Sequence, residues 1–160
     1  MWQEKGFVQD DADVNDAILR LEKYIDALAE RCRSISNEGL IQKPAPDKWS
    51  RKELLGHLID SAINNLKRFT EIQFSEQPYF IKPYKQNELV IVNNYQQLPL
   101  EHLLLLWQSL NRQIVYVVKE IPAAKLAYKV DPQYDNHEMK TLGWIICDYV
   151  AHMEHHMKQL

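Results

Sequence analysis

Residues 141–160, TLGWIICDYVAHMEHHMKQL, carry three of the chain's six histidines on a predicted helix. In this stretch the apolar residues recur every three or four positions, which is typical of a helix that packs one face on a core. These positions are Leu142, Ile145, Ile146, Tyr149, Met153, Met157 and Leu160. Thr141 precedes the first of them, where a helix N-cap is expected.

Two of these histidines share one face of the helix. Residues four apart lie one above the other, so His152 and His156 can offer two imidazoles to one metal ion. At about 100° per residue, His156 falls inside the apolar stripe, His152 on its flank and His155 toward water. The alternative is a histidine-rich helix end, favoured because cations suit the negative end of the helix dipole. That alternative does not explain an imidazole in the buried stripe, where it would cost stability without a partner.

The composition indicates one soluble domain that spans residues 1–160. The chain has 160 residues, of which 46% are hydrophobic, enough for one core. A net charge of -3 gives no reason to expect a nucleic-acid partner. No apolar run reaches the ~20 residues of a membrane helix, and residues 1–6 are too polar for a signal peptide. We therefore expect a cytoplasmic protein without a membrane partner, in which Cys32 and Cys147 are buried and reduced.

The same apolar periodicity predicts three more helices, at residues 12–35, 50–73 and 99–120. The second has the clearest start, because Ser50 and Glu53 form the Ser-x-x-Glu pattern of a capping box. Four helices of about 20 residues each, with no convincing sheet, predict an all-α fold built as a helix bundle.

The connections between these helices differ in length and composition. Residues 36–49 contain one glycine and two prolines and are predicted to be non-helical throughout. Residues 74–97 are too long for a tight turn. They could carry the chain along the bundle, so that the third helix runs parallel to the second, or drape aromatic rings over a pocket. Within them, residues 88–92 resemble a strand without an obvious partner, and residues 122–140 are predicted to be irregular.

The second helix carries a polar face that includes His57, Asp60 and Arg68. Such a face is either solvated or lines a water-filled cleft between helices, and the helical wheel favours a solvated His57. Asp60 is either a surface carboxylate or a group that orients an imidazole or acts as a base. Arg68 is either a surface arginine or a group that holds an anionic substrate.

Three stretches taken together resemble a known family, the DinB-like four-helix metalloproteins. They are KWS at 48–50, GHLID at 56–60 and HMEHH at 152–156. The resemblance covers nearly the whole chain. It implies a four-helix bundle in up-down-down-up order, with a long connection between helices 2 and 3. It also implies a three-histidine metal site with His57, His152 and His156 as ligands and His155 outside the set. For His57 this overrules the wheel, because the family places that histidine toward a pocket that solvent reaches.

The resemblance also implies a class of chemistry. Three imidazoles leave a metal position open for water or substrate, and such an ion activates either water or a thiol. Relatives include thiol-dependent transferases and isomerases as well as proteins labelled hydrolases. We therefore expect a metal-dependent hydrolase or thiol-dependent S-transferase that acts on a small molecule. Its ion would be zinc, nickel or iron, and its partner could be a low-molecular-weight thiol.

Two other hypotheses stay open at this point. In the first, the chain is a non-catalytic helical module in which the metal is structural or absent. In the second, the module forms a homodimer through an exposed apolar patch at Leu104 and Leu105 of the third predicted helix. A structural metal site would be closed by four protein ligands, whereas a catalytic one would have three.

Overall fold

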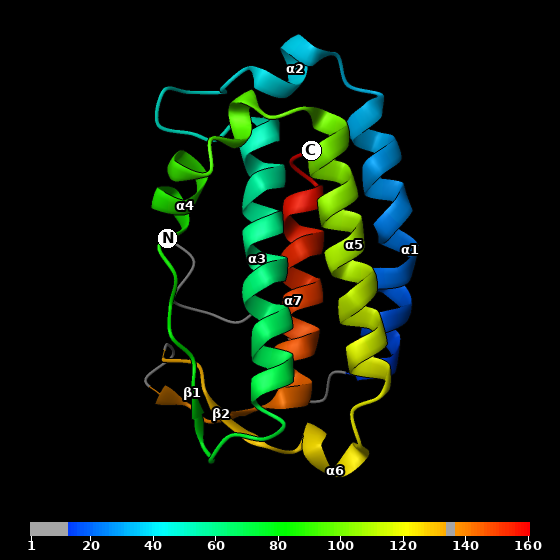
Figure 1. Ribbon diagram of the computed structural model, residues 1–160, viewed down its shortest axis with the longest axis vertical. Helices are drawn as coiled ribbons and strands as arrows, with labels where there is room; N and C mark the ends of the chain where they lie inside the picture. Colours follow the sequence, from blue (N-terminus) through cyan, green and yellow to red (C-terminus); the bar gives the residue numbers. More distant parts are fainter. Residues whose placement is uncertain (1–12, 134–136) are drawn as a thin grey trace.

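Four long helices packed side by side form the body of the molecule, as the sequence predicts. The computed structural model describes residues 13–133 and 137–160. The long helices are α1 (Val14–Arg33), α3 (Arg51–Glu71), α5 (Leu100–Lys119) and α7 (Leu142–Met157). In Figure 1, α1 and α7 run up the page while α3 and α5 run down it. The expected up-down-down-up order is thus confirmed.

Local capping explains why the predicted helix starts agree with the structure. The Ser50 hydroxyl accepts a hydrogen bond from the Glu53 N–H, and the Glu53 carboxylate accepts one from the Ser50 N–H at 2.8 Å. Thr141 caps α7 by accepting from the Trp144 N–H at 3.1 Å. Asp13 caps α1, whose predicted start at residue 12 lies outside the described residues. Each cap satisfies backbone donors that a helix leaves open at its first turn.

The core lies between the four helices and is almost entirely apolar. Its largest fully buried side chains include Leu21, Leu28, Leu55, Leu58, Phe69 and Trp107. One buried polar link crosses it, from the Tyr149 hydroxyl to the Asn111 side-chain oxygen at 2.5 Å. Leu104 belongs to this core and is fully buried, whereas Leu105 is 64% exposed. The proposed two-leucine dimer patch is therefore wrong, because α1 and α3 both pack along α5. No described helix is long and apolar enough to cross a membrane.

Short helices interrupt the connections, and here two predictions were wrong. Residues 36–49 are not free of helix, because Ser36 caps one turn, α2 (Asn37–Ile41), before the first proline. The strand-like stretch at 88–92 lies within a helix, α4 (Gln86–Val92). A short apolar run cannot be assigned to helix or strand from its periodicity alone. A 3-10 turn, η1 (Tyr95–Gln97), follows α4, and α6 (Ala123–Leu126) follows α5.

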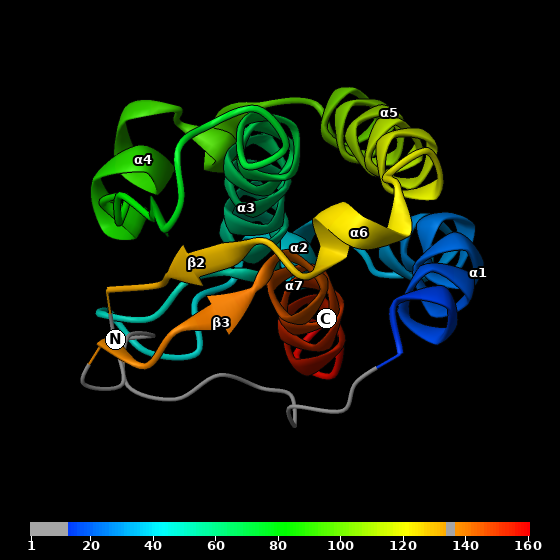
Figure 2. The ribbon, with the colours of Figure 1, turned by 90° about the horizontal axis from the view of Figure 1, so that it is seen from below.

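A small sheet closes one end of the bundle, contrary to the prediction of no sheet. Strand β2 (Lys129–Asp131) pairs in parallel with β1 (Tyr79–Phe80) and antiparallel with β3 (Lys140–Thr141). Figure 2 shows β2 and β3 beside α6 and the start of α7. Two or three residues are too few to show the alternating pattern by which a strand is recognised in a sequence.

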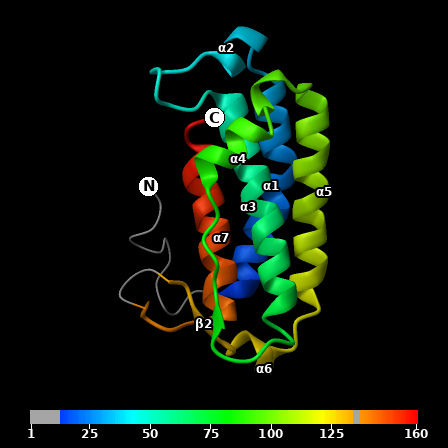
Figure 3. The ribbon, with the colours of Figure 1, turned by 60° about the vertical axis from the view of Figure 1, so that its left-hand side comes forward.

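The long connection between α3 and α5 runs back beside the bundle, as Figure 3 shows. It returns the chain to the starting end of α3, and α5 therefore runs parallel to α3, as the first of the two interpretations predicts. On the way it places α4 and η1 against α3. This covering segment decides which side chains of α3 meet solvent.

Candidate metal centre

Three imidazoles meet between α3 and the last turns of α7. The Nε2 atoms of His57 and His152 lie 3.4 Å apart, and those of His152 and His156 lie 3.1 Å apart. All three residues offer a ligand atom within 4.8 Å of one another. The structure therefore brings together the three histidines that the resemblance names. His57 comes from a segment about a hundred residues away in the sequence from the other two.

The donor geometry fits a divalent ion. Three nitrogens at zinc–nitrogen distances of 2.0–2.1 Å in a tetrahedral arrangement are about 3.3 Å from one another. The two measured Nε2–Nε2 distances, 3.4 and 3.1 Å, lie on either side of that value. Three imidazole nitrogens within 4.8 Å of one another are also a set that zinc, nickel and iron accept.

Burial keeps these imidazoles neutral. His57 and His156 are 0% and 1% exposed, and His152 is partly buried. Burial, followed by the neighbouring imidazoles, lowers the pKa of each of the three histidines to about 3. Each ring therefore has a lone pair available for a metal at neutral pH. The solvated His57 that the helical wheel favours is wrong, because other parts of the chain cover that face of α3.

Asp60, one turn beyond His57, is buried rather than on the surface. Its Oδ1 accepts hydrogen bonds from the Tyr95 hydroxyl at 2.6 Å and the Asn93 amide at 3.1 Å. Its Oδ2 has no hydrogen-bond partner among the described residues. Burial raises the pKa of Asp60, against the opposing effect of these two donors. In the described part of the chain, Asp60 therefore makes no hydrogen bond that would orient the His57 ring.

Sequence reasoning did not identify the two residues that hold Asp60. Asn93 and Tyr95 lie in the long connection, for which the sequence suggests no more than aromatic rings that could cover a pocket. Tyr95 can approach α3 because residue 56 is a glycine. A Cβ atom placed there would lie 2.1 Å from the Tyr95 Cδ2 and 2.2 Å from its Cγ. The glycine before His57 is the signal in the sequence that marks this close packing.

We expect Gly56→Ala to destabilise the protein by about 1–3 kcal/mol, the usual cost of overpacking. In an open helix the same change stabilises, because alanine is the better helix former. Gly143→Ala is the matched control, since its Cβ would come no closer than 3.3 Å to a neighbouring atom. Urea unfolding of the two variants measures the difference. A Gly56→Ala variant as stable as Gly143→Ala would contradict the packing described for Tyr95.

The remaining candidates lie outside the three-histidine group. His155 is partly buried and its ring centroid lies 5.4 Å from that of His156. Arg68 donates to the Lys82 carbonyl at 3.2 Å and lies over the Tyr84 ring. It lines an open cleft of about 520 Å³ between α3 and β1, to which none of the three histidines contributes. An anion-holding role for Arg68 at the histidines therefore has no support in these contacts.

The fold and the site together define a class, the helix bundles that present a histidine cluster to a metal. Within this class, the sequence model of the DinB superfamily matches residues 20–160, and the chain belongs to that superfamily. The chain is 22% identical over 153 residues to an Oceanobacillus iheyensis protein named "Putative metal-dependent hydrolase", a match covering 92% of this chain and 83% of that protein.

Solved structures show the same fold. YfiT from Bacillus subtilis, described as "a probable metal-dependent hydrolase with an unusual four-helix bundle topology", superposes with a TM-score of 0.83 at 20% identity. The match covers 96% of this chain and 88% of YfiT. A mycothiol-dependent maleylpyruvate isomerase superposes with a TM-score of 0.68 at 12% identity. That match covers 94% of this chain but only 61% of the isomerase.

Proposed function

We propose that this protein is a metal-dependent enzyme that acts on a small molecule at a site formed by His57, His152 and His156. The convergence of three neutral imidazole nitrogens, from two fully buried histidines and one partly buried histidine, is the observation that supports this proposal. A structural zinc site is closed by four protein ligands, whereas catalytic sites keep one position for water or substrate. In the described part of the chain the cluster has three members. This favours an open site over the non-catalytic alternative.

Hydrolysis is the reaction class that the proposal favours. A divalent ion bound there would polarise a substrate oxygen and lower the pKa of a bound water or thiol. The names of the Oceanobacillus relative and of YfiT point to metal-dependent hydrolysis in those proteins. The three histidines of this chain would hold the ion, and because they are neutral they would leave its full charge to act on the bound water.

Thiol-dependent transfer is the second candidate, favoured by the fold likeness to a mycothiol-dependent isomerase. The thiol would have to come from outside the chain. Cys32 and Cys147 are both buried, and burial raises the pKa of each to about 11. Neither forms a thiolate at neutral pH, so a low-molecular-weight thiol would be the nucleophile.

The deciding experiment is elemental analysis of the protein purified without a histidine tag, followed by X-ray absorption at the edge of the metal found. We expect about one divalent ion per chain, with three imidazole ligands and one or two exchangeable oxygen ligands. Four protein ligands would support the structural alternative, and no bound metal would reject the proposal. A screen of ester, amide and thiol-acceptor substrates, each with and without a small thiol, then separates hydrolysis from transfer.

We propose Asp60 as the base of the reaction, because it lies one turn beyond His57 on α3 and its buried Oδ2 has no hydrogen-bond partner in the described chain. We expect Asp60→Asn to lower kcat by about 100-fold or more, the usual contribution of a general base, with the metal content unchanged. Asp131→Asn is the matched control, because Asp131 is equally buried but lies in β2. Turnover and metal content of both variants test the assignment. Equal kcat for Asp60→Asn and the parent would exclude this role.

A further inference from the structure

We propose that Trp49 is a positioning residue for the His57 imidazole, held over the ring by the anchored start of α3. The proposal rests on the proposed function only where it concerns metal affinity. Its structural part concerns the ring orientation of His57 in the protein without metal.

Trp49 stacks on His57. Their ring centroids lie 4.8 Å apart, with 32° between the ring planes, in the range of favourable aromatic pairs. The rings of His152 and His156 contact His57 differently, at 80° and 74° to its plane. Trp49 therefore packs against the flat side of the imidazole while the other two histidines meet it nearly at right angles. This arrangement restricts rotation of the His57 side chain about its Cβ–Cγ bond.

His57 lacks the contact that usually fixes a metal-binding histidine. Such a histidine almost always donates its second ring N–H to a carboxylate, carbonyl or water, which sets the direction of the ring. The Nδ1 atom of His57 is buried and has no hydrogen-bond partner among the described residues. Among the described residues, the side chain of Asp60, the nearest carboxylate along α3, accepts hydrogen bonds from Tyr95 and Asn93 but not from His57. Besides the 3.4 Å contact between the Nε2 atoms of His57 and His152, the Trp49 contact is the one that can hold the His57 ring in this direction.

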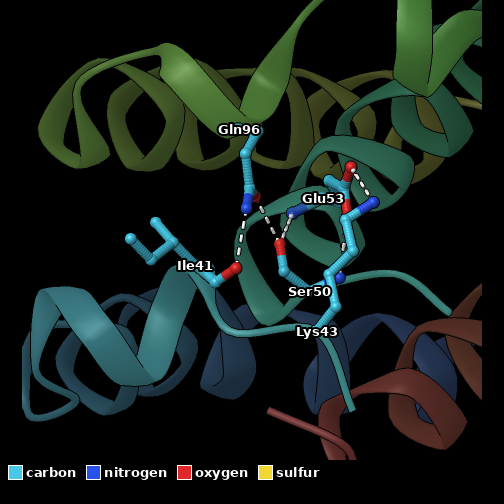
Figure 4. A network of polar contacts seen from close by, with 5 residues as sticks. All are labelled: Ile41, Lys43, Ser50, Glu53 and Gln96. Atoms are coloured by element: carbon cyan, nitrogen blue, oxygen red, sulfur yellow. Dashed lines mark hydrogen bonds and ion pairs between the residues drawn. The ribbon is translucent and has the colours of Figure 1, made fainter. Parts of the chain in front are cut away.

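The backbone beside Trp49 is fixed by a network of polar contacts, which Figure 4 shows. Ser50, the next residue, donates its N–H to Glu53 at 2.8 Å and its hydroxyl to Gln96 at 2.5 Å. Gln96 donates in turn to the carbonyl of Ile41 at 2.7 Å. Lys43 forms an ion pair of 2.8 Å with Glu53. The loop before α3 is thus tied to α3 and to η1, and Trp49 keeps its place although it is only partly buried.

A simpler role for Trp49 is the hydrophobic staple, in which it packs on Leu54 only to secure the helix start. The two roles require different side chains at position 49. A staple needs an apolar side chain of sufficient size, and leucine supplies one. Support for the His57 ring needs a flat aromatic face, which phenylalanine retains and leucine does not. Trp49→Phe and Trp49→Leu are therefore a matched pair that separates the two roles.

The first measurement follows the His57 ring in the metal-free protein by NMR, with the imidazole carbon–proton resonances assigned through His57→Gln. We expect a single sharp set of His57 resonances in the parent and in Trp49→Phe. In Trp49→Leu we expect the set to be broadened or doubled, because the ring samples more than one orientation. A sharp, single set in Trp49→Leu would overturn the proposal, whether or not the protein binds metal.

The second measurement is the dissociation constant for Zn²⁺, determined by competition with a chromophoric chelator. We expect Trp49→Leu to raise it by about 10-fold or more, as loss of an outer contact to a metal ligand does, and Trp49→Phe to stay within about threefold of the parent. Equal constants for the two variants would overturn the proposal, since a staple alone would then account for Trp49. A parent that binds no Zn²⁺, yet shows the NMR difference, would reject the proposed function and leave the positioning role standing.

Discussion

Alanine at position 57, 152 or 156 should each abolish tight metal binding, whereas alanine at position 155 should leave it intact. The three rings whose Nε2 atoms converge are those of His57, His152 and His156. Removing one of three ligands should weaken binding by more than the 10–100-fold that the loss of an outer-shell partner costs. His155 lies beside His156 on the same helix but outside the group. If the histidines of α7 serve only to interact with the negative end of the helix dipole, alanine at positions 152, 155 and 156 should have the same effect.

Metal content after dialysis against a chelator and reloading with Zn²⁺ measures this effect in all four variants. His155→Ala is the matched control, because it removes the same side chain from the same turn of α7. Thermal unfolding of the metal-free variants shows whether a loss of metal reflects a loss of fold. Equal metal loss in the four variants, or none in any of them, would refute the three-histidine assignment.

The metal-free protein should lose stability as the pH falls from about 6.5 toward about 3. In the folded chain the pKa of each of the three histidines is about 3, lowered first by burial, whereas in the unfolded chain it is about 6.5. Between these values the unfolded state binds more protons, so the free energy of unfolding rises with pH and falls on acidification. Each such histidine contributes a slope of about 1.4 kcal/mol per pH unit within the window.

His57→Gln should reduce this slope by about 1.4 kcal/mol per pH unit, because one titrating group is removed from the buried cluster. His102→Gln should leave it unchanged, since His102 lies exposed in the first turn of α5. Urea unfolding in chelator-containing buffers at pH 4.5, 5.5 and 6.5 gives the slope for each variant, and all three values lie within the window. The same slope in His57→Gln and in the parent would show that burial of this imidazole does not govern the acid sensitivity.

Added Zn²⁺ should raise the free energy of unfolding by a nearly constant amount between about pH 6.5 and the folded-state pKa of about 3. The ion binds only neutral imidazoles, so metal binding and protonation compete for the same nitrogens. The ion adds stability by mass action, and this contribution is lost only when the histidines of the folded chain take up protons, near their pKa of about 3. The comparison between chelated and Zn²⁺-loaded protein separates the effect of burial from the effect of the ion.

Helix pattern and capping were predictable because both depend on residues close together in the chain. The Ser50–Glu53 box and the Thr141 cap occur where the sequence places them. The pairing of His152 with His156 follows from the pitch of a single helix. The small sheet and the turn of helix at residues 37–41 were missed, since elements of two to five residues carry almost no periodic signal.

The sequence by itself determined the four amphipathic helices, their caps and the face on which two of the histidines lie, because a helix repeats its geometry every few residues. Only the tertiary structure decided the environment of His57 and Asp60, two polar residues that the wheel could not distinguish from a solvated surface. Whether a polar side chain is exposed depends on which distant segment packs over it. Here the end of α7, Trp49 and the connection that carries Tyr95 cover them, so that two unremarkable positions of α3 become a buried imidazole and a buried carboxylate.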